Sequence, residues 1–180
     1  SSSALVCNVF HHWRRIGEPE KIAQAASLPS TRIESLEFEA KCSISDRFER
    51  APNLDVLLRF QGQSRPKLIG IESKFSEPFG WEHSGLKAKY LEQASLWEGL
   101  PNLHQLAKEI SPDDTRYQYL HAAQLLKHVL GLRNAAGNDS FILLYLFYDV
   151  PGDEGARHRV EIQDFTSMPK SDGVDLRMLT

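Results

Sequence analysis

The sequence predicts an α/β sandwich, in which helices flank one central mixed β-sheet. Three observations predict this fold class. Helical and strand patterns follow one another in the order helices, three strands, helices, one strand, one helix and a possible last strand. Residues 141–150 are apolar on both sides, as expected of a central strand that helices cover. The 180 residues, of which 41% are hydrophobic and 25% charged, suit a single domain with its own core.

The N-terminal segment predicts two helices and a strand. Residues 4–15 carry apolar side chains four positions apart, which is typical of a helix. Pro19 suits the first turn of a second, shorter helix. Residues 33–42 alternate between apolar and acidic side chains, which predicts a half-buried strand. The apolar side of that strand is expected to consist of Leu36, Phe38 and Ala40.

Residues 54–60 and 67–75 predict two further strands, joined by a turn-like segment. In the first, Leu54, Val56, Leu58 and Phe60 are expected to share an apolar side. Asp55 lies on the opposite side of that strand. In the second, strand alternation puts Glu72 and Lys74 on one face. If the two strands pair as a hairpin, Asp55 can join them there.

The C-terminal half predicts more helices around one apolar strand. The helices are expected at residues 86–97, 103–110 and 115–132, and the strand at 141–150. A helix is preferred for residues 154–168, although part of this segment alternates as a strand would. The last six residues resemble the middle of a strand, so the natural chain is expected to continue past Thr180.

Composition and charge exclude several classes of protein. The formal net charge of −3 excludes a wholly basic nucleic-acid coat, but it allows a local basic groove. Two cysteines are too few for a disulfide framework, which favours a reducing, cytoplasmic setting. The longest apolar run, residues 141–148, is far too short to span a membrane, so no membrane partner is expected.

Asp55, Glu72 and Lys74 form the candidate chemical cluster. Two carboxylates offer the hard oxygen ligands that Mg²⁺ prefers, and bound Mg²⁺ neutralises phosphate charge and acidifies its water. A lysine beside them can orient that water. An acid-x-lysine tripeptide alone carries little information, since residues 39–41 form a second copy. Only the copy at Glu72 has an upstream aspartate on an adjacent predicted strand, and a surface ion pair is the alternative interpretation.

The cluster and its surroundings resemble the PD-(D/E)xK nuclease superfamily. The resemblance rests on Pro-Asn-Leu-Asp at residues 52–55 and Glu-Ser-Lys at residues 72–74, and it covers about residues 33–150. The first ten residues and residues 124–128 resemble a bacterial restriction-endonuclease-like family within it, the PGN_0703-like group. This resemblance implies a restriction-endonuclease-like three-layer sandwich and hydrolysis of DNA phosphodiester bonds with Mg²⁺, for which Mn²⁺ could substitute.

The same resemblance implies a role for each residue of the cluster. Asp55 and Glu72 would bind the metal, with the backbone carbonyl of Ser73 as a further ligand. Lys74 would assist the attack of water on the phosphodiester. One departure from the family pattern is that Pro52 lies three residues before Asp55 rather than directly before it.

Two further residues are weaker candidates. Related helicase-associated nucleases place a Gln and, four residues later, a Tyr on the helix after the motif, so Gln124 resembles that Gln and His128 replaces the Tyr. Gln124 would bind the scissile phosphate or a metal-bound water. In the predicted helix Tyr117, His121, Gln124 and His128 share one stripe, and an exposed polar face is the alternative. Glu39, near the end of its strand, could add a metal ligand, or it could simply face solvent.

The expected partner is DNA, and the alternative function is a module of the same fold that binds nucleic acid without cutting it. A homodimer is plausible, because many enzymes that cut duplex DNA need two active sites. Several cations could contact phosphates, namely Arg14, Arg15, Lys87, Lys89 and Arg116. Trp81, in a loop rich in Pro and Gly, could stack on a base, although anchoring the loop is the expected role.

Overall fold

The computed structural model describes residues 2–28, 32–62, 65–75 and 83–180. Its strands are β1 (Ile33–Lys41), β2 (Asn53–Phe60), β3 (Leu68–Lys74), β4 (Phe141–Phe147) and β5 (Asp175–Leu179). Its helices are α1 (Ser2–Arg15), α2 (Glu20–Ala25), α3 (Ala88–Leu91), the 3₁₀ helix η1 (Ala94–Trp97), α4 (Pro101–Glu109), α5 (Ala122–Ala136) and α6 (Asp153–Ser171). Within these described ranges, no helix combines the length and the apolar character needed to cross a membrane.

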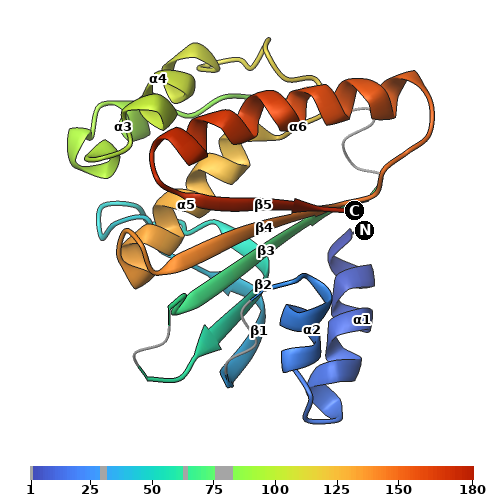
Figure 1. Cartoon of the computed structure of the whole chain (residues 1–180). Helices are drawn as coiled ribbons and strands as arrows, with labels where there is room; N and C mark the ends of the chain where they lie inside the picture. Colours follow the sequence, from blue (N-terminus) through green and yellow to red (C-terminus); the bar gives the residue numbers. More distant parts are fainter. Residues whose placement is uncertain (1, 29–31, 63–64, 76–82) are drawn as a thin grey trace.

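The strands form one mixed sheet in the order β1-β2-β3-β4-β5. β2 runs antiparallel to both β1 and β3, whereas β4 runs parallel to both β3 and β5. Helices α1 and α2 lie on one face of the sheet, and α4, α5 and α6 lie on the other (Figure 1). The predicted α/β sandwich is therefore confirmed, and so is the hairpin of the second and third strands.

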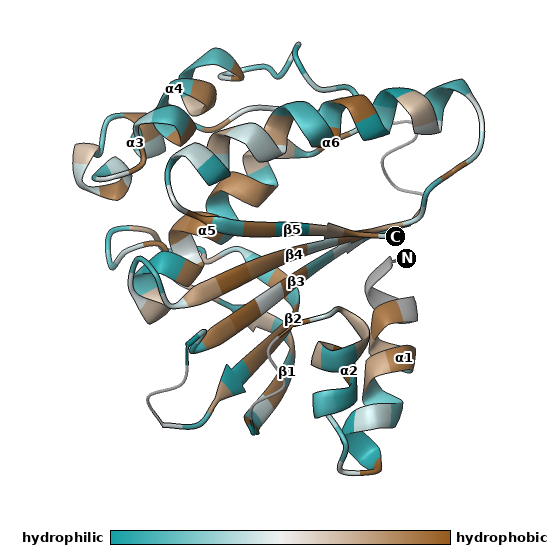
Figure 2. Ribbon diagram, in the orientation of Figure 1, coloured by the Kyte–Doolittle hydropathy of each residue, from teal (hydrophilic) through white to brown (hydrophobic). Residues whose placement is uncertain are grey.

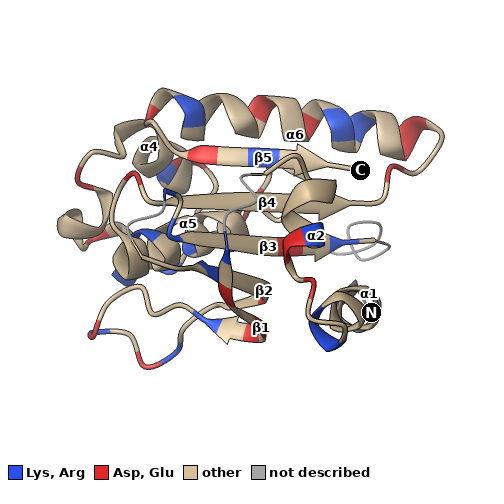
Figure 3. Cartoon of the chain, turned by 60° about the horizontal axis from the view of Figure 1, so that its bottom comes forward, with Lys and Arg blue, Asp and Glu red and all other residues tan. Residues whose placement is uncertain are grey.

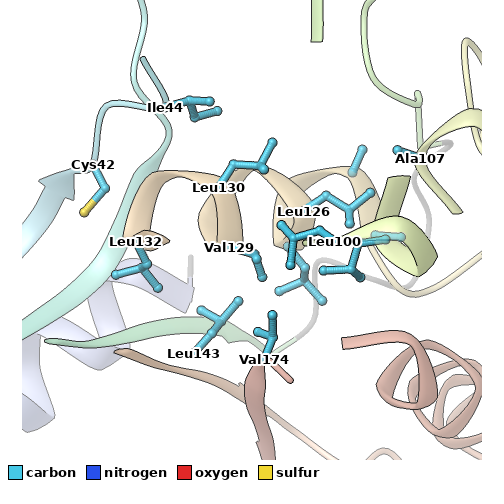
Figure 4. Close-up of a cluster of buried hydrophobic side chains, with 14 of the residues drawn as sticks. Cys42, Ile44, Leu100, Ala107, Leu126, Val129, Leu130, Leu132, Leu143 and Val174 are labelled. Atoms are coloured by element: carbon cyan, nitrogen blue, oxygen red, sulfur yellow. The ribbon is translucent and has the colours of Figure 1, made fainter. Parts of the chain in front are cut away.

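Buried apolar side chains fill both faces of the sheet. The core on the α1 face contains Val56, Leu58, Ile69, Ile71, Ile142 and Leu144 from the strands. The core on the α5 face includes Leu126, Val129, Leu130, Leu132 and Leu143, which gather around α5 in Figure 4. Figure 2 shows the most hydrophobic residues concentrated on the strands. Because both of its faces are covered, β4 carries no charged residue, as Figure 3 shows.

Two glycines let α5 lie close to the sheet. A Cβ added at Gly131 would lie 2.5 Å from the carbonyl oxygen of Cys42. One added at Gly70 in β3 would lie 2.8 Å from a methyl carbon of Leu132 and 2.9 Å from one of Leu54. Interiors are close-packed, so neither position has room for a side chain unless a neighbour moves. The two glycines thus set how far the side chains of α5 reach toward β3.

The predicted apolar sides of the first two strands are wrong at Ala40 and Leu54, which pair with each other but face the opposite side of the sheet. Both of these side chains belong to the core on the α5 face, whereas Phe38 and Val56 contact the core on the α1 face. A strict period of two would have kept Ala40 with Phe38, and Leu54 with Val56. Glu39 has a left-handed backbone with φ of 49°, which rotates β1 between Phe38 and Ala40 and interrupts this period.

The helix predicted over residues 115–132 is wrong at its start, because α5 begins only at Ala122. The segment before it is held in an irregular form by a carboxylate of α6. Glu161 accepts hydrogen bonds from the backbone N–H groups of residues 118–120, each at 2.8 Å. These N–H groups donate to the side chain of Glu161 rather than to backbone carbonyls of a helix. The helix therefore begins after them, and Tyr117 does not lie on α5.

Of the other predictions for the C-terminal half, some are confirmed and some are wrong. Residues 86–97 do not form one helix but divide into α3 and η1, and the indole of Trp97 donates a hydrogen bond at 2.8 Å to the carbonyl of Tyr90. The helix preferred for residues 154–168 is confirmed by α6, and the strand expected at the end is confirmed by β5. β4 ends at Phe147, three residues before the predicted end of its strand.

Candidate active site

The hairpin of β2 and β3 brings Asp55 to the segment that holds Glu72 and Lys74. Val56 pairs with Ile71, and Asp55 and Glu72 are the next residues of the two strands beyond that pair. The side chain of Asp55 is buried, and its Oδ2 atom accepts hydrogen bonds from the backbone N–H of Ser73 at 2.8 Å and from its hydroxyl at 2.5 Å. Asp55 is thus joined to the cluster through Ser73, the residue between Glu72 and Lys74.

Glu72 is the centre of the cluster, and its residue is only 1% exposed. Its Oε1 atom accepts a charge-assisted hydrogen bond from the ammonium group of Lys74 and another, at 2.8 Å, from the amide of Gln124. Its Oε2 atom lies 3.0 Å from Nε2 of His128. Neither of these two atoms has an aligned hydrogen-bond partner among the described residues, so their contact is electrostatic.

The buried Glu72 is a carboxylate at neutral pH. Burial alone would raise its pKa, because a charge is poorly solvated inside a protein. The adjacent His128 and Lys74 outweigh burial and hold the pKa of Glu72 below its ordinary value. A negatively charged oxygen ligand is therefore available inside the fold.

Helix α5 supplies both Gln124 and His128, which lie one turn apart on the same side. The exposed polar face offered as an alternative for this helix is not what the structure shows, because His128 is completely buried and both side chains contact Glu72. The predicted stripe with Tyr117 and His121 does not form, since Tyr117 precedes the helix and His121 is its N-cap. The sequence indicated only that His128 lies four residues after Gln124 on a predicted helix. It did not indicate that His128 contacts Glu72.

Two further histidines flank Lys74. The rings of His83 and His121 stack with their centroids 4.7 Å apart. Burial lowers the pKa of His121 to about 4, and the positive charge of Lys74 contributes to this shift. Burial also lowers the pKa of His83. Both rings are therefore neutral at neutral pH, and Lys74 is the cation that balances Glu72 on this side.

Glu72 offers one oxygen atom that a cation could use. In the described part of the chain, no three His, Cys, Asp or Glu side chains are grouped to hold a metal, so Glu39 does not complete a trio with Asp55 and Glu72. Mg²⁺ commonly uses only one or two carboxylates, together with water and phosphate oxygens. Oε2 of Glu72 is buried and has no hydrogen-bond partner among the described residues, so it remains available to a cation.

Several of the cations expected to contact phosphates are engaged within the fold. Arg116 forms ion pairs with Glu109 at 2.6 Å and Asp164 at 2.9 Å. The ammonium of Lys89 lies 5.0 Å from the centroid of the Phe48 ring, where a cation–π contact is favourable. The guanidinium of Arg14 likewise lies over the ring of Phe38, at 5.9 Å from its centroid. Trp81 lies outside the described residues.

Comparison with known proteins identifies the family. A family described as "restriction endonuclease associating with ARP" matches residues 1–148 of this chain. No curated protein and no solved structure matches it. The matched range runs through β4 and includes Asp55, Glu72, Lys74, Gln124 and His128. The expected restriction-endonuclease-like family is thereby confirmed, and the flanked mixed sheet is compatible with that fold. The chain belongs to the restriction endonucleases associating with ARP, a family of nuclease type.

Proposed function

We propose that this protein is a metal-dependent deoxyribonuclease that hydrolyses phosphodiester bonds of DNA. The observation that carries the proposal is the environment of Glu72. One oxygen of this buried carboxylate accepts hydrogen bonds from Lys74 and Gln124. The next residue, Ser73, donates a hydrogen bond to Asp55. Such a site is costly without a function, because burying charged groups requires compensation. Membership of a restriction endonuclease family supports the same conclusion.

Each residue of the site then has a chemical task. Asp55, Glu72 and the backbone carbonyl of Ser73 would hold Mg²⁺, or Mn²⁺ in its place. When bound, the metal supplies Lewis-acid stabilisation of the phosphate and an acidified water. Lys74 orients the attacking water, and its charge stabilises the negative charge that develops on the phosphate. Gln124 is held in place by the hydrogen bond that it donates to Glu72. Its amide would contact the scissile phosphate or the water.

The alternative, a module that binds nucleic acid without cutting it, has less support. Buried carboxylates beside a DNA backbone repel its phosphates unless a cation lies between them. A binding module would gain nothing from keeping Asp55, Glu72 and Lys74 together. By its family description the protein would also associate with ARP. A homodimer and a cytoplasmic setting stay predictions.

Metal binding can be measured separately from cleavage. A ligand that binds only the folded state raises the free energy of unfolding by about 2.7 kcal/mol at 100 times its Kd. Mg²⁺ or Mn²⁺ should therefore raise the melting temperature of the protein, and EDTA should reverse the shift. Asp55→Ala should reduce the shift, whereas Asp139→Ala, at an exposed turn position, should keep it. No shift and no calorimetric binding with the wild type would contradict the proposal.

A further inference from the structure

His128 is a buried polar side chain that the proposed reaction does not use. It is 0% exposed, and neither of its ring nitrogens has a hydrogen-bond partner in the described part of the chain. The great majority of buried polar side chains in folded proteins have such partners, so an exception calls for an explanation. The explanation must involve Glu72, because Nε2 of His128 lies 3.0 Å from Oε2 of that carboxylate.

The two oxygens of Glu72 are divided between partners. Oε1 is bonded to Lys74 and Gln124, and Oε2 faces His128. Gln124 and His128 come from successive turns of α5, so a single rigid helix contacts both oxygens. Because Gly131 has no side chain, that helix can lie close to the backbone of Cys42, the residue that follows β1. The rotation of the carboxylate is therefore restricted on both sides.

The tautomer of the imidazole ring determines whether Nε2 of His128 attracts or repels Oε2 of Glu72. With its proton on Nε2, the ring directs a donor toward the carboxylate and attracts it. With its proton on Nδ1, the ring would direct a lone pair at a negative oxygen and repel it. The first tautomer is the one compatible with a contact of 3.0 Å. A donor that is near Oε2 but not aligned with it can orient this oxygen and still leave a lone pair for a cation.

We propose that His128 is a positioning residue, which orients the carboxylate of Glu72 for metal binding without touching the metal itself. This inference rests on the proposed function, since it concerns the metal that Glu72 would hold. Partners that orient a ligand in this way typically change metal affinity by about 10- to 100-fold when they are removed.

The test uses two substitutions at His128 and the same two at a matched histidine. His128→Phe keeps a planar ring and removes the donor, whereas His128→Gln keeps an N–H group that can reach Oε2. His158 in α6 is the control, because it is also buried, at 1% exposure, and contacts the hydroxyl of Tyr145 at 3.3 Å. Calorimetry should show that His128→Phe weakens Mn²⁺ binding by about 10-fold or more. His128→Gln should restore most of the affinity, and His158→Phe and His158→Gln should bind as the wild type does.

Two results would overturn the positioning role while leaving the nuclease proposal intact. One is equal Mn²⁺ affinity in His128→Phe and His158→Phe. The other is a ¹⁴N coupling in the electron spin echo spectrum of wild-type protein with Mn²⁺ that disappears in His128→Gln, because it would make His128 a direct ligand. If His128→Phe does not fold, His128→Leu takes its place in the comparison. A wild type that binds no Mn²⁺ and cuts no DNA would overturn the proposed function and this inference together.

Discussion

Lys74→Met should abolish DNA cleavage and also destabilise the fold. Cleavage should fall at least about 100-fold, because the group that orients the water is gone. The free energy of unfolding should fall by about 3 kcal/mol, because buried Glu72 would lose the ion pair with Lys74 that compensates part of its burial. The side chain of Glu72 is 2% exposed and that of Lys74 18%, so solvent can replace little of the lost interaction. Urea denaturation and a cleavage time course measure the two effects.

A second substitution separates the loss of catalysis from the loss of stability. In the double variant Glu72→Gln/Lys74→Met the buried charge is removed together with its partner. Its unfolding free energy should return most of the way to the wild-type value, while cleavage stays absent. Wild-type cleavage by folded Lys74→Met would exclude the lysine from the mechanism. A double variant no more stable than Lys74→Met would show that the ion pair is not what compensates the buried charge.

Gly131→Ala should destabilise the protein, although the same change in most helices stabilises them. Alanine favours a helix over glycine by about 1 kcal/mol. Here the new Cβ would meet the carbonyl oxygen of Cys42 at 2.5 Å, and such overpacking costs about 1–3 kcal/mol. If α5 moves outward, Gln124 and His128 move away from Glu72. We therefore expect a lower melting temperature together with reduced cleavage at a temperature where the variant is still folded.

Gly155→Ala is the matched control for that substitution. A Cβ at Gly155 in α6 would lie 1.7 Å from the carbonyl oxygen of Val150, so this variant should also lose stability. Because α6 contributes no side chain to the cluster around Glu72, the folded fraction of Gly155→Ala should cut DNA at the wild-type rate. A Gly131→Ala variant as stable and as active as the wild type would show that the close approach of α5 does not position the site.

The sequence predicted the parts of the fold that depend on local pattern. Apolar alternation identified β2 and β3, and their short connection implied the hairpin that brings Asp55 to Ser73. The face reversal at Glu39 was not predictable, because a left-handed glutamate has no composition signal that separates it from an ordinary strand residue. Ala40 follows that reversal and lies in the core on the α5 face, together with Leu54, its partner in β2.

Contacts between distant residues account for what was missed. The late start of α5 follows from Glu161, which lies more than 40 residues after the N–H groups that it binds. The contact between His128 and Glu72 likewise joins a helix and a strand that are far apart in the chain. Helical periodicity predicted that Gln124 and His128 share a side of α5, but only the tertiary structure shows that this side faces the carboxylate.

The most direct test of the account is DNA cleavage by the wild type and by Asp55→Ala, measured on plasmid and on single-stranded DNA with Mg²⁺, Mn²⁺ or EDTA. Asp139→Ala controls for the loss of an exposed carboxylate. We expect cleavage that requires the metal, that EDTA stops, that Asp139→Ala retains and that folded Asp55→Ala lacks. Cleavage that persists in Asp55→Ala, or in EDTA, would contradict a metal-dependent centre built on Asp55, Glu72 and Lys74.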